Sequence, residues 1–136
     1  MKTWITICEG CKRGDWNDRQ VVVTDGDVLA QAIETCAQTA QVETRRVSCT
    51  MGCERACNVI IQGLDNAGRA KIGYSLGSFD GTVEDAQAIT EFAELHALSS
   101  TGQVPFRTWP VGVKGHFVSR HLPLPIESES SQADKT

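Results

Sequence analysis

Alternating apolar and polar residues mark two short strands in the first half of the chain. Residues 3–7 alternate and predict a strand that ends at Cys8. Residues 42–47 alternate in the same way and predict a second strand that leads to Cys49. Between them, apolar residues recur at helical spacing over residues 27–40. The pattern therefore predicts a strand–helix–strand unit in which each strand delivers the chain to a cysteine.

A hairpin and a second helix are predicted in the next part of the chain. A β-branched run at residues 57–61 is followed by a turn signal at 65–68, and residues 69–76 are expected to return as the partner strand. Thr82 opens an approximate capping box, and the amphipathic helix after it extends to about Leu98. We therefore predict an α/β, thioredoxin-like fold: a βαβ unit followed by a β-hairpin and a C-terminal helix, with a four-stranded mixed sheet.

Glycines and prolines interrupt the chain after the second predicted helix. They predict an irregular C-terminal arm over residues 99–125 that wraps the domain. Residues 126–136 are mostly polar, and we expect them to form a disordered tail. The length of 136 residues suits one domain, which we place at residues 1–125.

The composition argues against several classes of partner. The chain has 13 Lys and Arg residues against 17 Asp and Glu, and a net charge of −4 does not provide the basic surface that binds nucleic acid. No apolar run approaches the roughly 18 to 20 residues that cross a bilayer. The apolar stretch before Cys8 is too short for a signal peptide. We therefore expect a cytoplasmic protein with no nucleic-acid or membrane partner.

Six cysteines are many for a chain in a reducing compartment, where they indicate metal or redox chemistry rather than disulfides. Four of them form two pairs, Cys8-x-x-Cys11 after the first predicted strand and Cys49-x₃-Cys53 after the second. The carboxyl ends of neighbouring parallel strands lie at one sheet edge, so we expect the pairs to converge. Four thiolates, two for each iron, are what a 2Fe–2S cluster requires. These four cysteines are therefore the candidate ligands of one 2Fe–2S cluster.

Three other interpretations of these cysteines stay open. Four thiolates also hold structural zinc, although zinc ribbons usually place two C-x-x-C pairs about 15 to 20 residues apart; here residues 12–48 separate the pairs. A thioredoxin-like dithiol at Cys8 and Cys11 needs a helix N-terminus at the attacking cysteine, and the predicted helix begins well after Cys11. Buried structural thiols are the third interpretation, but the four cysteines fall in polar, glycine-bearing segments.

The remaining cysteines and the histidines are expected to have structural roles. Cys36 lies on the apolar stripe of the first predicted helix and is expected in the core. Cys57 opens an apolar strand and is expected to pack beneath the cluster loop. The histidines lack ligand spacing to a cysteine pair, so we expect surface positions or packing of the arm for His96, His116 and His121. Because no catalytic set accompanies the cysteines, we expect an electron-transfer protein and not an enzyme.

The two cysteine pairs resemble those of the thioredoxin-like 2Fe–2S ferredoxins. In those proteins one pair follows the first strand and a C-x₃-C pair follows the second. Matched residue by residue, the resemblance implies that the cluster ligands are Cys8, Cys11, Cys49 and Cys53. It also implies an electron carrier that serves a reductase and an acceptor oxidoreductase. Some of these ferredoxins are dimers, so a homodimer is an assembly that the resemblance allows.

A closer resemblance, over about residues 3–125, is to a bacterial family of predicted metal-binding proteins. Its shared motifs match residues 8–11, 49–57, 74–77 and 105–110. The chain departs from that pattern at Thr50-Met51, where Leu-Ser is usual, and at Trp109, where Arg is common. Some members are encoded among cobalamin-biosynthesis genes, which implies service to a biosynthetic oxidoreductase such as one in cobalamin metabolism.

Overall fold

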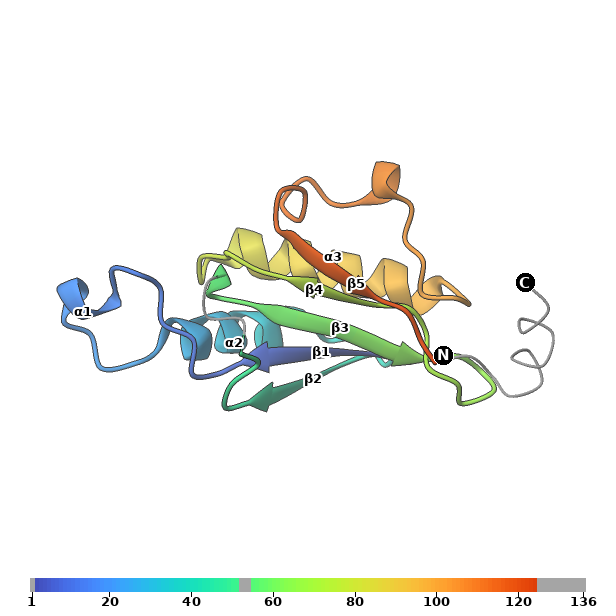
Figure 1. Cartoon of the computed structure of the whole chain (residues 1–136), viewed down its shortest axis with the longest axis horizontal. Coiled ribbons are helices and arrows are strands. Elements are labelled where there is room, and N and C mark those ends of the chain that lie inside the picture. The colour runs from blue at the N-terminus through green and yellow to red at the C-terminus, as the bar shows by residue number, and fades with distance from the viewer. Residues whose placement is uncertain (1, 52–54, 125–136) are drawn as a thin grey trace.

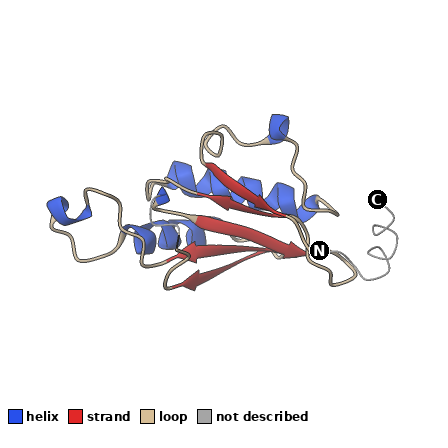
Figure 2. Cartoon of the chain, viewed as in Figure 1, coloured by secondary structure: helices blue, strands red, loops and turns tan. Residues whose placement is uncertain are grey.

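The structure, a computed structural model, describes residues 2–51 and 55–124 of the chain. Within these residues, five strands form one mixed sheet (Figure 2). Helices α2 (Asp25–Cys36) and α3 (Val83–Leu98) contact each other and pack on the sheet, α2 against its first two strands along the chain and α3 against its first three (Figure 1). The fold therefore belongs to the α/β class that the sequence predicts.

The strands follow the predicted order along the chain. A parallel pair joined through α2 comes first, and an antiparallel pair leading to α3 comes next. The order across the sheet is β2-β1-β3-β4-β5. The strands are β1 (Lys2–Cys8), β2 (Val42–Val47), β3 (Val59–Leu64), β4 (Gly73–Leu76) and β5 (Phe117–His121).

The prediction of a four-stranded sheet was wrong, because part of the predicted irregular arm forms a fifth strand. β5 pairs antiparallel with β4, from Gly73 opposite His121 to Leu76 opposite Phe117. It is an edge strand in which only Ser119 is partly buried. Such a strand is held by backbone pairing rather than by a buried face, so it has no hydrophobic alternation for a sequence pattern to detect. The predicted tail, residues 126–136, lies outside the described residues.

The two long helices begin at side-chain caps. The Thr24 hydroxyl accepts a hydrogen bond of 3.1 Å from the backbone N–H of Asp27, and Thr82 caps α3 in the same way through Asp85. A one-turn helix, α1 (Trp16–Arg19), lies in a loop that projects away from the sheet (Figure 1). Among the described residues, no helix combines the length and the apolar character needed to span a membrane.

The core lies between the sheet and the two long helices. Its largest side chains are fully or almost fully buried: Ile5, Ile7, Leu29, Ile33, Ile61, Tyr74, Leu76, Phe79, Ile89 and Phe92. The Tyr74 ring meets that of Phe92 edge to face, with 5.1 Å between the ring centroids. β1 lies between β2 and β3 and packs beneath both helices, so the first cysteine pair begins at the end of an interior strand.

His96 was expected at the surface or in packing of the arm, but it is fully buried on α3. Its Nδ1 lies 2.7 Å from the Thr3 hydroxyl, and its Nε2 lies 2.6 Å from the carbonyl oxygen of Ile72. Burial lowers the pKa of His96 to about 4. Beside it, the buried Lys71 ammonium donates to the carbonyl oxygens of His96 and Ser99 at the end of α3. Both side chains therefore serve the fold at the end of the sheet opposite the cysteines.

Candidate functional site

The first cysteine pair lies where β1 and β2 end side by side. Cys8 is the last residue of β1 and is in register with Val47, the last residue of β2. Beyond the strands, the Glu9 N–H donates to the Val47 carbonyl at 2.8 Å and the Gly10 N–H donates to the Ser48 carbonyl at 3.2 Å. The backbone of the first cysteine loop is thus tied to the segment that leads directly into Cys49.

Gly10 permits this close approach of the two backbones. A Cβ atom added at residue 10 would lie 2.5 Å from the carbonyl oxygen of Ser48. That distance is well inside van der Waals contact, so a larger residue would push the loop away from β2. The glycine inside the Cys8-x-x-Cys11 motif is therefore explained by contact between the loops.

Cys8 and Cys11 are both buried, with 2% and 4% of their surface exposed. Burial raises the pKa of the Cys11 thiol to about 12, and a side-chain hydrogen bond with Cys8 adds to the rise. Cys57 is fully buried close to this pair. Burial raises its pKa to about 12 as well, and the neighbouring Asp25 carboxylate contributes. The described site is a desolvated group of thiols in which negative charge is costly without a cation.

The second cysteine pair is described only in part. Cys49 is exposed, and its sulfur accepts a hydrogen bond of 3.3 Å from the Met51 N–H. Cys53 lies outside the described residues. Within residues 2–51 and 55–124, no three His, Cys, Asp or Glu side chains form a group that could hold a metal ion. The structure therefore brings together the first pair and the backbone of the second loop, but not the thiol of Cys49.

Cys36 and Cys57 lie in the body of the fold. Cys36 is half-buried at the end of α2 and packs against the core, as the sequence predicts. Cys57 interacts with both Cys8 and Cys11 and so lies close to the first pair, in line with its expected position beneath the cluster loop. The pairing of β3 with β1, continued by the hydrogen bond from the Cys8 N–H to the Asn58 carbonyl, brings this segment next to the end of β1.

The start of α2 also contacts the first cysteine loop. The Gly26 N–H donates to the Cys11 carbonyl at 2.9 Å, and a Cβ atom at Gly26 would lie 2.0 Å from the Cys8 carbonyl oxygen. The helix begins well after Cys11 in the sequence, as expected, but its start lies against the Cys11 backbone because the intervening loop folds outward and returns (Figure 1). The raised pKa of Cys11 is nevertheless the opposite of what an attacking thiol requires.

A buried carboxylate, Asp25, anchors the projecting loop to this helix start. Its side chain accepts a hydrogen bond of 2.6 Å from the Arg13 N–H, and Arg19 Nη2 lies 2.7 Å from each carboxylate oxygen. Burial acts to raise the pKa of Asp25, but the bonds from Arg19 and Arg13 outweigh it and hold that pKa below its usual range. Asp25 therefore closes the projecting loop against the start of α2.

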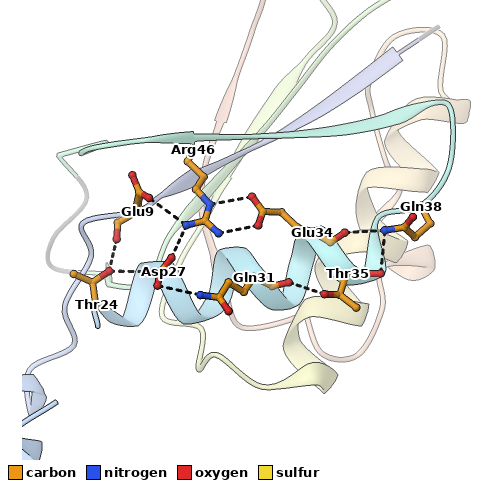
Figure 3. Close-up of polar contacts among 8 residues, drawn as sticks. All are labelled: Glu9, Thr24, Asp27, Gln31, Glu34, Thr35, Gln38 and Arg46. Carbon is orange, nitrogen blue, oxygen red and sulfur yellow. Dashed lines mark hydrogen bonds and ion pairs between the residues drawn. The ribbon is translucent and has the colours of Figure 1, made fainter. Parts of the chain in front are cut away.

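Arg46, a residue of β2, joins that strand to α2 and to Glu9 in the first cysteine loop (Figure 3). Its guanidinium contacts Glu9 at 3.1 Å, Asp27 at 2.5 Å and Glu34 at 2.7 Å. These carboxylates raise the pKa of Arg46, and hydrogen bonding to Arg46 lowers the pKa of Glu34. Thr24, the cap of α2, adds a hydrogen bond of 2.5 Å to the Glu9 carbonyl.

One further polar residue, Asn58, lies buried directly beside the thiols. Its side-chain nitrogen is 3.5 Å from the Cys11 sulfur, and its side-chain oxygen accepts a short hydrogen bond from the Thr50 hydroxyl. The sequence pattern missed Asn58. The only signal was an amide residue between a cysteine and an apolar strand, which is too common to indicate a role.

Comparison with known proteins places the chain in a family. No curated protein and no solved structure matches this sequence. One family model, described as "Protein of unknown function (DUF1636)", matches residues 5–123 and so spans both cysteine loops, the sheet and the arm. The chain therefore belongs to the DUF1636 family.

Proposed function

We propose that this protein is an electron carrier that holds one 2Fe–2S cluster with Cys8, Cys11, Cys49 and Cys53. The observation that carries the proposal is the pair of backbone hydrogen bonds beyond the ends of β1 and β2, from Glu9 to Val47 and from Gly10 to Ser48. They attach the segment bearing the first cysteine pair to the segment that enters the second pair. Two such pairs at one sheet edge supply the two thiolates that each iron needs.

The chemistry of the described residues fits such a group. Cys8 and Cys11 are withdrawn from water, and the raised pKa of Cys11 means that the thiolate form needs a bound cation. Cys49 stands at the same edge and is exposed. Cys53 lies outside the described residues, so its place in the ligand set rests on its spacing from Cys49.

The proposed fold is thioredoxin-like. In support, β1 and β2 are parallel and joined through α2, β3 and β4 form an antiparallel pair on the other side of β1, and α3 packs beside α2. β5 extends this arrangement at the edge beyond β4. In support of the ligand assignment, Cys8 is the last residue of β1 and Cys49 follows the end of β2.

In this proposal the chain's residues position and shield the ligands. The cluster, when bound, would supply one-electron chemistry. Burial of Cys8 and Cys11 excludes water from one side of the site, and Gly10 keeps the two loops in contact. At the second pair, Met51, which lies between Cys49 and Cys53 in the sequence, is 87% exposed. We infer that redox partners, a reductase and an acceptor oxidoreductase, approach from this side.

The proposal also covers the location of the protein, its assembly and its electron acceptor. We propose a cytoplasmic carrier that is not itself an enzyme, and a homodimer is the assembly that the resemblance to dimeric ferredoxins allows. A biosynthetic oxidoreductase, such as one in cobalamin metabolism, is the proposed acceptor. The alternative is a zinc-binding or other metal-handling module that uses the same four thiolates without redox activity.

The deciding experiment is to purify the full chain without air from cells supplied with iron. We expect red-brown protein with about two irons and two acid-labile sulfides per chain, whose visible absorption is bleached by dithionite. The reduced protein should give the paramagnetic signal of a one-electron reduced cluster. Colourless protein with zinc and no sulfide would replace the proposal with the zinc alternative.

A further inference from the structure

We propose that Asn58 is a positioning residue of the cysteine site, which donates a side-chain N–H to the Cys11 sulfur and links that ligand to the second cysteine loop. The inference rests on the proposed function, because it takes Cys11 as a ligand. It goes beyond that function by naming a residue outside the cysteines that sets how firmly metal is held and how easily the site is reduced.

The geometry of Asn58 connects three parts of the site. Its backbone carbonyl accepts a hydrogen bond of 3.3 Å from the Cys8 N–H. Its side-chain nitrogen lies 3.5 Å from the Cys11 sulfur. Its side-chain oxygen accepts from the hydroxyl of Thr50, the residue after Cys49. A single buried residue thus contacts both cysteines of the first pair and the beginning of the second cysteine loop.

The orientation of the amide follows from the chemistry of its two neighbours. A metal-binding thiolate has no proton and can only accept hydrogen bonds, so the N–H end of the amide must face Cys11. The oxygen end then faces Thr50, whose hydroxyl can donate to it. Both ends of the Asn58 amide are used, and the surrounding residues leave it 5% exposed. The arrangement suits a sulfur that carries negative charge.

Hydrogen bonds to ligand sulfurs affect both the affinity of the site for metal and its reduction potential. An N–H aimed at sulfur offsets part of the negative charge on the ligand, and that charge is larger in the reduced state. Removing the donor should therefore disfavour reduction and lower the reduction potential. Loss of such outer contacts also weakens metal binding, typically by ten- to a hundred-fold.

The test compares two variants of the full-length protein as purified, Asn58→Asp and Asn58→Ala. Asp keeps the shape and the acceptor for Thr50 but loses the N–H and adds charge, whereas Ala loses the donor without adding charge. At the wild-type midpoint potential, each should raise the ratio of oxidised to reduced protein about tenfold, which for one electron is a potential lower by about 59 mV. Each should also lose its metal to a chelator faster than wild type.

The matched control is Thr3→Val, which removes a buried hydrogen bond at the opposite end of β1. It should lower the melting temperature without changing the potential or the rate of metal loss. Circular dichroism checks that each variant is folded. If the Asn58→Ala variant does not fold, the Asn58→Asp variant still tests the inference.

The outcomes separate this inference from the proposed function. If wild type holds a cluster but both Asn58 variants have its potential and its rate of metal loss, the inference is overturned and the proposed function stands. If wild type holds zinc, the proposed function fails, and faster zinc loss in the variants alone supports the role of Asn58. Protein that binds neither iron nor zinc overturns both.

Discussion

The Thr3 hydroxyl lies 2.7 Å from Nδ1 of His96, a ring that is fully buried. Nε2 faces the carbonyl oxygen of Ile72, which can only accept, so Nε2 carries the proton. Nδ1 then accepts from Thr3. The neutral imidazole uses both of its nitrogens, and a second proton on Nδ1 would reverse the hydrogen bond with Thr3 and place a positive charge in the core.

The stability of the protein should therefore fall as the pH drops from about 6.5 to about 4. Burial lowers the pKa of His96 to about 4 in the folded chain, against 6.5 for an ordinary histidine. In this window the unfolded chain binds the extra proton and the folded chain does not, so protonation favours unfolding, by up to about 3 kcal/mol at pH 4. Urea unfolding across this range measures the slope.

The variant His96→Gln isolates this contribution. It cannot titrate, so its stability should change less than that of wild type between pH 7 and pH 4, although it starts lower at pH 7. Equal slopes for the two proteins would show that other groups cause the pH dependence.

Replacing Gly10 by Ala should disrupt the cysteine edge. The new Cβ would lie 2.5 Å from the Ser48 carbonyl oxygen, and relief requires the two loops to separate. We expect a loss of about 2 kcal/mol in the free energy of unfolding and weaker retention of bound metal. Gly14→Ala is the matched control, because a Cβ at Gly14 meets nothing within 4 Å. A Gly10 variant that behaves like the Gly14 variant would contradict the close contact between the loops.

Elements with strong local signals could be predicted from the sequence. β2 occupies Val42–Val47, as its alternation predicts, and α3 runs from the residue after Thr82 to Leu98. The placement of Cys8 at the end of β1 followed from the same kind of pattern. Local periodicity and caps were sufficient for these elements because each buries a regular face or begins at a defined cap.

The parts of the site that were not predicted depend on contacts between distant segments. The loop between Cys11 and α2 folds out and returns, so Gly26 meets the Cys11 carbonyl despite their separation along the chain. Asn58 reaches the Cys11 sulfur only because β3 pairs with β1. Such proximity leaves no periodic signal in the sequence, since it arises from strand order rather than from local propensity.

Arg46→Met should destabilise the fold by about 1 to 2 kcal/mol, because the guanidinium contacts Glu9, Asp27 and Glu34 together (Figure 3). The effect should shrink in 1 M salt, where screening weakens the pairs in wild type. Urea unfolding at low and high salt measures both quantities. Arg120→Met is the control, since Arg120 has no ion pair in the described part of the chain. Equal effects of the two substitutions would argue against a network centred on Arg46.

Single alanine substitutions should separate ligands from structural cysteines. We expect each of four variants to lose most of the cluster or to hold it weakly: those at Cys8, Cys11, Cys49 and Cys53. Cys36→Ala is the control and should keep a full cluster while losing about 1 kcal/mol of stability, because Cys36 packs against the core. Iron and sulfide analysis of protein purified without air gives the comparison. Loss of iron in the Cys36 variant would mean that cluster content follows stability rather than ligation.

Cys57→Ala is the most informative single variant, because Cys57 is fully buried and interacts with Cys8 and Cys11. We expect it to keep the cluster, with a loss of about 1 kcal/mol in the free energy of unfolding and a changed potential. The reason is that Cys57 precedes the buried strand β3 and is held by backbone hydrogen bonds to Phe79 on both its N–H and its carbonyl. If Cys57→Ala abolishes iron binding while Cys53→Ala does not, the second pair is Cys49 with Cys57. The cluster would then be held by Cys8 and Cys11 at the end of β1, by the exposed Cys49 after β2 and by the buried Cys57 before β3.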